Sequence, residues 1–313
     1  MIDRSHYPLD VNFFNLLIWA YKTAKEDCYY YKDRPRPRQI SAHRIASSVF
    51  PHLSGSVFII GSPRSGTTFL GECIASLPEV SYHHEPIAIK GAARHVYMNH
   101  WSFPKARFYY RAVYRWLKRI HADGDLRLAE KTPRNCLIMS FLYRVFPDAR
   151  FVYIVRDCRD AALSHSKKPW LSSKASGSGR IEPGGYPHGP SARFWVEEDR
   201  RKEFENTSDI HRCAWNWRIY NEHVIRELPL MPESRLLMLK YENLVTDQKK
   251  WGNRILDFLE IDRQRSRSVF HEKIESGNAR SIGLWKKELH SPELVQIYKE
   301  SGELMDMFGY IRK

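Results

Sequence analysis

One stretch near the start of the chain constrains the fold more than any other: an apolar run, a glycine-bounded loop and an apolar helical pattern in direct succession. The run is Val57–Ile60, the loop GSPRSGTT occupies residues 61–68, and the helical pattern reaches about Leu77. A short apolar run that ends at glycine is typical of a buried strand in a parallel sheet. Glycine lets the backbone curl, so that successive N–H groups and the positive end of the helix dipole converge on an anion. The stretch therefore predicts a strand, a phosphate-binding loop and a helix.

The rest of the chain repeats this alternation of strands and helices. Apolar runs predict strands at residues 151–155 and 236–239, and a further short strand is expected at 127–129. Apolar spacing predicts a helix at 136–146, and another helix is expected from about Asp160 onward. Strands that alternate with helices are typical of a parallel sheet covered on both faces. We therefore expect an α/β fold, a P-loop-NTPase-like parallel sheet of about five strands flanked by helices on both faces.

The loop departs at one position from the pattern of nucleotide kinases. Its spacing matches G-x-x-x-x-G-K-[ST], except that Thr67 stands where that pattern has lysine. The lysine contacts the β- and γ-phosphates of a triphosphate, so its absence argues against such a ligand, whereas Arg64 within the loop suits a shorter diphosphate-like group. A P-loop nucleotide kinase or NTPase stays as an alternative, which a requirement for Mg²⁺ would favour.

The charge balance favours anionic partners. Lys and Arg number 50 against 36 Asp and Glu, which is a formal net charge of +14 in 313 residues. Such a surplus attracts nucleotides, nucleic acid, acidic glycans or a membrane face. A non-catalytic basic protein that binds polyanions is therefore a second alternative, but it leaves the phosphate motifs unexplained, and we expect no nucleic-acid partner.

Cysteine usage and hydropathy bear on the compartment. The five cysteines are widely spaced without a C-x-x-C pair, so we expect a reducing compartment and no bound metal. The apolar run Val11–Ala20 is too short to span a bilayer, and the residues before it lack a signal-peptide pattern. We expect a cytoplasmic protein without a transmembrane segment, with a helical extension and basic linker at residues 1–50 and one domain at 51–313.

Two motifs resemble those of a known family. The sequence SPRSGTTFL at residues 62–70 is similar to the loop that holds the 5′-phosphosulfate in sulfotransferases that use 3′-phosphoadenosine 5′-phosphosulfate (PAPS), especially the bacterial, tyrosylprotein and glycan branches. About ninety residues later, FVYIVRDCRDAALS at 151–164 resembles the 3′-phosphate signature of that family. The resemblance implies that residues 51–313 are a sulfotransferase domain. It would transfer a sulfuryl group from PAPS to a hydroxyl or amine of an acceptor, leaving 3′-phosphoadenosine 5′-phosphate (PAP).

The resemblance extends from Val57 to Lys286 and implies a set of donor-binding residues. The segment KYENL follows a predicted strand, and RSIGLWK at 280–286 resembles the C-terminal segment that closes over the nucleotide. The implied donor-binding residues are Arg64, Ser65, Gly66, Thr67, Thr68, Arg156, Ser164, Tyr241, Arg280, Ser281, Gly283, Trp285 and Lys286. Lys168 is a weaker candidate, and Trp285 either packs on the nucleotide or anchors its segment in the core. We interpret the acidic and basic residues at 157–160 as helix capping and local pairing.

A few side chains are candidates for the chemistry. Glu85 has the same offset from the loop as the catalytic glutamate of the tyrosylprotein branch, and we expect it to be the general base, with partial desolvation raising its pKa toward neutrality. His84 and His83 are rivals, because imidazole is the usual base at neutral pH. Lys131 is expected to neutralise the leaving group. Cytosolic small-molecule members have a catalytic histidine where this sequence has Pro133, which favours Glu85.

Two segments lie outside the catalytic motifs. Residues 172–191 are rich in Ser, Gly and Pro, and we expect a flexible surface loop that supplies little core and is either a lid or a tolerated insertion. Residues 87–120 are crowded with aromatic and cationic side chains, and we expect helices near the acceptor cleft. The acceptor is expected to be a small metabolite, with a natural product, a glycan and a lipid head group left open.

Overall fold

The computed structural model describes residues 42–182, 185–277 and 279–310, together with Asn15, Ile18, Tyr21, Lys22 and Lys25. Most of the predicted N-terminal extension, including the basic linker at residues 34–38, lies outside the described residues. None of the described helices is long and apolar enough to cross a membrane.

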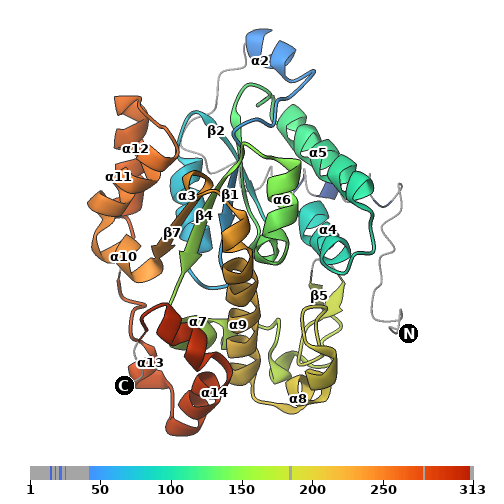
Figure 1. Ribbon diagram of the computed structural model, residues 1–313, viewed down its shortest axis with the longest axis vertical. Helices are drawn as coiled ribbons and strands as arrows, with labels where there is room; N and C mark the ends of the chain where they lie inside the picture. Colours follow the sequence, from blue (N-terminus) through green and yellow to red (C-terminus); the bar gives the residue numbers. More distant parts are fainter. Residues whose placement is uncertain are drawn as a thin grey trace.

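Five parallel strands form the central sheet, in the order β2-β3-β1-β4-β7 (Figure 1). They are β1 (Val57–Ile60), β2 (Val80–His84), β3 (Arg127–Lys131), β4 (Arg150–Val155) and β7 (Leu236–Lys240). The register places His84 at the end of β2 opposite Lys131 at the end of β3, and Val155 of β4 opposite Lys240 of β7. The expected parallel sheet of about five strands is confirmed.

Helices cover both faces of this sheet, as the alternating pattern predicts (Figure 1). One face carries α3 (Thr67–Ala75), α10 (Tyr241–Thr246), α11 (Gln248–Phe258) and α12 (Gln264–Glu275). The other carries α4 (Ile87–Tyr97), α5 (Phe103–Ile120), α6 (Met139–Val145) and α9 (Asp209–Glu227), and α14 (Ser291–Met307) packs against α9. The remaining described α-helices are α2 (Ala42–Ser47), α7 (Cys158–Ser166), α8 (Arg201–Asn206) and α13 (Trp285–Glu288). Short 3₁₀ turns lie at Pro133–Ile138, Ser173–Ala175, Glu198–Arg200, Leu228–Leu230 and Glu233–Arg235.

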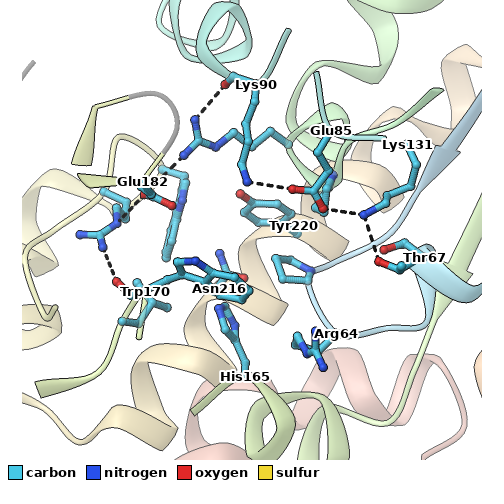
Figure 2. A pocket seen from close by; sticks show the side chains of 17 residues that line it. Arg64, Thr67, Glu85, Lys90, Lys131, His165, Trp170, Glu182, Asn216 and Tyr220 are labelled. Carbon is cyan, nitrogen blue, oxygen red and sulfur yellow. Dashed lines mark hydrogen bonds and ion pairs between the residues drawn. The ribbon is translucent and has the colours of Figure 1, made fainter. Parts of the chain in front are cut away.

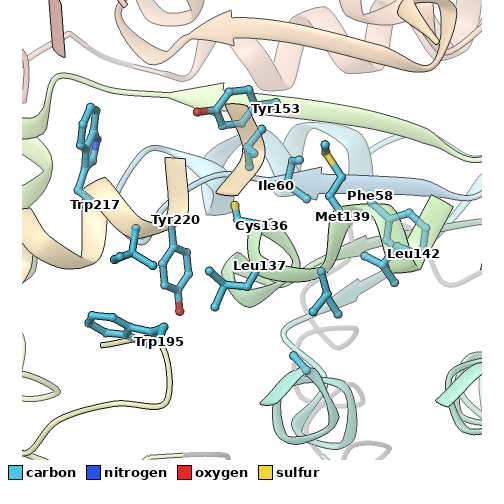
Figure 3. Close-up of a cluster of buried hydrophobic side chains, with 14 of the residues drawn as sticks. Phe58, Ile60, Cys136, Leu137, Met139, Leu142, Tyr153, Trp195, Trp217 and Tyr220 are labelled. Carbon is cyan, nitrogen blue, oxygen red and sulfur yellow. The ribbon is translucent and has the colours of Figure 1, made fainter. Parts of the chain in front are cut away.

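The core has two parts because successive side chains of a strand point to opposite faces. Phe58 and Ile60 of β1 belong to the larger cluster, beneath α4, α5 and α9, whereas Val57 and Ile59 pack beneath α3, α11 and α12. All four are fully buried, which is why the run is continuously apolar. Figure 3 shows part of the larger cluster, which continues through Tyr220 toward the wall of a cleft.

Two elements differ from the sequence-based prediction. The apolar pattern does not predict β2, because Ser81 and His83 are polar; both are buried, and Ser81 Oγ lies 3.0 Å from His83 Nε2 and 3.0 Å from Asp123 Oδ2. The helix predicted at 136–146 is divided into a 3₁₀ turn at Pro133–Ile138 and α6. The buried hydrogen bonds of β2 replace the apolar contacts that a sequence pattern detects.

Residues 172–191 supply more of the core than their composition predicts. They include a short antiparallel hairpin of β5 (Ile181–Glu182) and β6 (Tyr186–Pro187). Tyr186 is only 3% exposed and belongs to the larger core cluster, and Ser172 Oγ donates to Asp209 Oδ2 at 2.8 Å. The expectation that this segment contributes little to the core is therefore wrong at Tyr186, while its flexibility stays a prediction.

The carboxyl ends of the strands bring the predicted site residues to one edge of the sheet. The phosphate loop follows β1, Glu85 follows β2, Lys131 ends β3, Arg156 follows β4 and Tyr241 follows β7. In open α/β sheets, ligands bind outside the carboxyl ends of the strands. The topology therefore assembles these residues at the edge where this fold class places its sites.

Candidate active site

The phosphate loop has the backbone conformation that its glycines predict. Arg64 and Gly66 both have positive φ, 70° and 91°, and Gly66 is the N-cap residue of α3. Ser62 Oγ and Ser65 Oγ lie 2.7 Å apart within the loop. A Cβ added at Gly66 would lie 2.3 Å from the ring of Tyr241, so that no other residue fits there without displacing the ring. The positive φ values curl the loop directly into the N-terminus of α3, where a helix has unpaired N–H groups and the positive end of its dipole.

Two arginines meet beside this loop. Arg64 Nε donates to Ser164 Oγ at 3.1 Å, and Arg156 Nη1 donates to the carbonyl oxygen of Arg64 at 3.1 Å. Burial, and then the charge of Arg156, lowers the pKa of Arg64. Neither guanidinium forms an ion pair with a carboxylate among the described residues, and the buried Nε of Arg156 has no hydrogen-bond partner there. Two adjacent cations and an unsatisfied donor are the chemistry of an anion site.

On the opposite side of the loop, Glu85 lies between two lysines. Its carboxylate accepts from Lys131 Nζ at 2.5 Å and from Lys90 Nζ at 2.8 Å, and Lys131 also donates to Thr68 Oγ1 at 3.1 Å (Figure 2). The backbone orients Glu85, because its N–H donates to the carbonyl of Lys131 at 2.8 Å and its φ is 44°. Burial favours a raised pKa for Glu85, but Lys131 and Lys90 together hold that pKa well below its usual range. The expected rise toward neutrality is therefore wrong for this state of the protein.

The two histidines that rival Glu85 lie outside the cleft. His83 is fully buried against Ser81, and His84 Nδ1 lies 3.3 Å from the hydroxyl of Tyr82. Burial, followed by the charge of Lys131, lowers the pKa of His84 to about 4. Neither histidine belongs to the residues that line the cleft, whereas Glu85 does. The geometry therefore favours Glu85 over both.

The cleft joins the phosphate loop to Glu85 and has about 700 Å³ of space, including the part open to solvent (Figure 2). Of the predicted residues, Arg64, Thr67, Thr68, Glu85 and Lys131 line it. The sequence-based prediction did not place the following residues there: Lys90, Arg134, His165, Trp170, Leu171, Glu182, Arg193, Trp195, Asn216 and Tyr220. These side chains add an aromatic wall and a second group of charges.

The second group of charges centres on Glu182 of the β5–β6 hairpin. Its carboxylate lies 3.1 Å from Arg193 Nε and 3.4 Å from Arg134 Nη2. Arg193 is 2% exposed and also donates to the carbonyl of Trp170, at 2.5 Å, and to that of Pro187, at 3.0 Å. Burial opposes ionisation of Glu182, but Arg134 and Arg193 lower its pKa overall. Glu182 is the single acidic residue of the segment 172–191, a signal that could have marked it in the sequence.

One further titratable side chain, His165, faces this space from the end of α7. It is 5% exposed, and its ring packs edge-on against Trp170 at 5.7 Å between centroids. Burial, and then the charge of Arg64, lowers the pKa of His165 to about 3, so that the imidazole is neutral. His165 directly follows Ser164, the last residue of the predicted 3′-phosphate motif, so its position next to that motif could have marked it as a candidate.

The C-terminal segment docks beside Arg156 through a carboxylate that the sequence-based interpretation assigned to local pairing. Asp160 accepts from the N–H of Gly283 at 2.6 Å and from that of Trp285 at 3.0 Å. Arg156 Nη2 donates to the carbonyl of Ser281 at 2.6 Å, and the hydroxyl of Tyr241 lies 3.0 Å from Ser281 Oγ. These contacts bring Ser281 and Gly283 next to the adjacent arginines Arg64 and Arg156.

The other residues of this segment differ in their surroundings. Trp285 is buried in the core, with the guanidinium of Arg159 3.9 Å above its ring, so that it anchors the segment. Arg159 also pairs with Asp157, the N-cap of α7, at 2.6 Å, as expected of capping residues. Arg280 and Lys286 are exposed, and Lys168 is half-buried. In the part of the chain that the structure describes, no group of His, Cys, Asp or Glu side chains is arranged to hold a metal ion.

A parallel sheet with a glycine loop after its central strand, and with two adjacent arginines at the carboxyl edge of the sheet, defines an α/β protein of the phosphate-loop type. Within this class, the chain belongs to the sulfotransferase family, whose model matches residues 56–265. The five-stranded fold and the match over most of the domain agree with the family that the two motifs resemble.

Individual relatives are distant. A protein-tyrosine sulfotransferase of Drosophila melanogaster is 23% identical over 255 residues, which are 77% of this chain but 44% of that protein, so this chain spans less than half the length of the relative. Among solved structures, sulfotransferase STF9 from Mycobacterium avium is similar with a TM-score of 0.50 and 13% identity, covering 94% of this chain and 84% of that chain. Mouse sulfotransferase SULT7A1, solved with PAP, is similar with a TM-score of 0.46 and 14% identity over 85% of this chain and 90% of that chain. At 13% identity, the similarity to STF9 bears on the fold alone.

Proposed function

We propose that this protein transfers a sulfuryl group from PAPS to a hydroxyl or amine of a small acceptor. The observation that carries the proposal is the cleft itself, in which the arginine-lined phosphate loop faces the Glu85–Lys131 pair. Lys131 links the two sides, because it contacts both Glu85 and Thr68 of the loop helix. A donor anion and an acceptor hydroxyl would therefore meet at residues suited to each of them.

The donor side fits a nucleotide with two separate anionic groups. Arg64 and Arg156 repel one another without a carboxylate partner among the described residues, and the Nε of Arg156 is unsatisfied, so a bound phosphate would relieve both costs. The residues that would hold the 5′ side are Arg64, Ser65, Gly66, Thr67 and Thr68. The residues that would hold the 3′-phosphate side are Arg156, Ser164, Tyr241, Arg280, Ser281, Gly283 and Lys286, with Trp285 anchoring their segment in the core.

The donor, when bound, supplies a sulfuryl group attached to a phosphate that can leave. In the proposed reaction Glu85 accepts the proton of the acceptor hydroxyl while the acceptor oxygen bonds to sulfur. Lys131 donates to the phosphate oxygen that takes the electron pair of the breaking S–O bond. The proton ends on Glu85 and the negative charge on PAP, so the transfer needs no metal.

The low pKa of Glu85 is compatible with this role because its cause is removable. The carboxylate is a weak base only while Lys131 and Lys90 both contact it. An anion bound at the loop competes for Lys131, which then shares its charge between Glu85 and the anion. We propose that donor binding raises the basicity of Glu85 in this way and so couples the two substrates.

The acceptor side supports a compact molecule with a ring. Trp170, Trp195 and Tyr220 line the cleft, and the β5–β6 hairpin lies beside it. The buried Oδ1 of Asn216 has no hydrogen-bond partner among the described residues, so it can accept from a ligand hydroxyl or N–H. A small metabolite with a cyclic scaffold and a second donor group matches these features better than an extended polymer does.

Isothermal titration with PAP, with ATP and Mg²⁺ as the control, tests the donor site. We expect tight and selective binding of PAP, followed by turnover of labelled PAPS with ring-containing alcohols that is unaffected by EDTA. Selective binding of ATP, or turnover that requires a divalent metal, would overturn the proposal in favour of a nucleotide kinase or NTPase.

A further inference from the structure

Helix α5 has one face in the core and a very different face toward solvent. The inner face contributes Tyr109, Tyr110, Val113, Tyr114 and Leu117, all of them buried. Tyr109 also donates to the carbonyl of Ala88 in α4 at 3.1 Å, which fixes the helix against the domain. The outer face is therefore presented to solvent in a defined orientation, along one side of the molecule (Figure 1).

A row of arginines runs along this outer face. Arg107, Arg111, Arg115 and Arg119 follow one another at intervals of four residues, so that they lie on one side of the helix. The helix has no acidic residue, and none of the four forms an ion pair among the described residues. Burial, followed by the charges of Arg115 and Arg107, lowers the pKa of Arg111, and Asp148 offsets part of that effect. Like charges at this spacing destabilise a helix. Arg111 donates to the carbonyl of Val145 at 3.4 Å and Arg119 to that of Val49 at 2.7 Å, whereas Arg107 and Arg115 have no ion-pair partner among the described residues.

A second row of large apolar side chains runs beside the arginines. Phe108, Trp116 and Ile120, again spaced by multiples of four, are 67%, 45% and 39% exposed. The turn after α2 adds Val49 and Phe50, 54% and 85% exposed, next to the end of α5, because Arg119 donates to the carbonyl of Val49 at 2.7 Å. Large exposed hydrophobic side chains that gather on one element mark an interaction surface.

We propose that this face of α5, with the adjoining turn at residues 49–50, binds the surface of a bilayer that contains anionic phospholipids. A helix with cations beside aromatic and aliphatic residues lies in the headgroup region, where the apolar row enters the acyl boundary and the arginines contact lipid phosphates. A nucleic acid would satisfy the arginines but would leave Phe108, Trp116 and Phe50 in water. The apolar row therefore decides between the two polyanions, and the proposal is independent of the acceptor of the enzyme.

Co-sedimentation of the full chain with vesicles tests the proposal. We expect binding to vesicles of phosphatidylcholine with phosphatidylserine as the minor component, and at least tenfold weaker binding to phosphatidylcholine alone. The double variant Arg107→Glu/Arg115→Glu should lose binding to the anionic vesicles by at least tenfold. The control Lys249→Glu/Lys250→Glu reverses the same number of exposed charges on α11, away from any apolar row, and should bind within about twofold of the original protein.

The apolar row has its own readout. Brominated phosphatidylcholine in the anionic vesicles should quench part of the tryptophan fluorescence, and Trp116→Phe should keep the binding while losing that quenching. Circular dichroism and PAP titration of each variant report whether it is folded.

Absence of vesicle binding by the original protein overturns the proposal, as does an equal loss of vesicle binding in the α11 control. Binding of duplex DNA that only the arginine variant abolishes, without vesicle binding, would assign the face to nucleic acid. A dimer that Trp116→Ser dissociates would assign it to a second copy of the chain.

Discussion

The positively charged side chains on the two sides of the cleft differ in their partners. On the loop side, Arg64 and Arg156 contact a hydroxyl and backbone oxygens, but among the described residues neither has a carboxylate partner. On the opposite wall, each of the four lining lysines and arginines contacts either Glu85 or Glu182. Arg64, which lines the cleft, and the adjacent Arg156 therefore have no carboxylate partner among the described residues, whereas the cations of the opposite wall are ion-paired.

This difference indicates which kind of ligand each side of the cleft can bind. Adjacent unpaired guanidinium groups repel one another, and only an anionic ligand removes that cost. Paired charges gain little from a further anion, but they hold hydrogen-bonding atoms in place beside the aromatic wall. We infer that the loop side binds an anionic donor and that the opposite wall, called the paired wall because its lysines and arginines are ion-paired, binds an uncharged acceptor. Four experiments test this distinction.

The largest effect is expected from Glu85→Gln. The amide cannot accept the acceptor proton, so kcat should fall by roughly 10²–10⁴-fold, while PAP affinity stays within a few fold. Steady-state kinetics with PAPS and calorimetry with PAP measure the two quantities. Glu182→Gln is the matched control on the same wall; it should change the KM for the acceptor and leave kcat largely intact. Unchanged turnover in the Glu85 variant would remove Glu85 as the base.

Arg156→Ala should produce the next largest effect. Loss of a charge-assisted contact to the 3′-phosphate should weaken PAP binding by roughly 10–100-fold, while adenosine 5′-phosphate, which lacks that group, should be affected much less. Arg134→Ala, on the paired wall, should keep PAP affinity within about twofold. Equal losses for the two nucleotides would count against a 3′-phosphate site, and an equal loss in the two variants would erase the distinction between the two sides.

A smaller effect is expected from Asp160→Ala, which frees the N–H groups of Gly283 and Trp285. Each buried hydrogen bond contributes about 1 kcal/mol, so the segment should detach from Arg156 and PAP affinity should fall by about three- to tenfold. The control is Glu288→Gln, which removes an exposed ion pair with Lys167 and should change nothing measurable. If PAP binds the Asp160 variant normally, the C-terminal segment does not belong to the donor side.

The smallest effect is expected from pH. Because Lys131 and Lys90 hold the pKa of Glu85 well below its usual range, the carboxylate stays ionised as the pH falls from about 8 to 5. The acid limb of kcat/KM should therefore lie below pH 5 in the free enzyme. An acid limb near pH 6.5 would indicate a histidine of ordinary pKa as the base, a description that does not fit His84.

Much of the donor side could be predicted because its residues belong to local patterns. A strand that ends at glycine predicts the loop with Arg64, and a strand followed by an arginine and a helix predicts Arg156 and Ser164. Glu85 and Lys131 could also be named individually. Their contact was not predictable in the same way, because β2 has buried polar residues and gives no apolar strand signal.

The composition of the paired wall could not be predicted from the sequence, because its residues come from segments that share no motif. Arg134 lies in a 3₁₀ turn, Glu182 in a hairpin, and Asn216 and Tyr220 on successive turns of α9. The Gly- and Pro-rich composition of residues 172–191 predicts exposed loop backbone, yet Arg193 donates to the carbonyls of Pro187, Gly189 and Ser191 and so holds that segment in place.

The parallel sheet, the phosphate loop, the order of the donor motifs and the net charge of +14 can all be read from the amino-acid sequence alone. These properties depend on residues close together along the chain, where backbone geometry links spacing directly to structure. The tertiary structure was needed to show which cations are ion-paired, which carboxylates face the cleft and which face of α5 is exposed. Those properties depend on contacts between distant segments, and the energy of a charge is set by the partners and the solvent that the fold places around it.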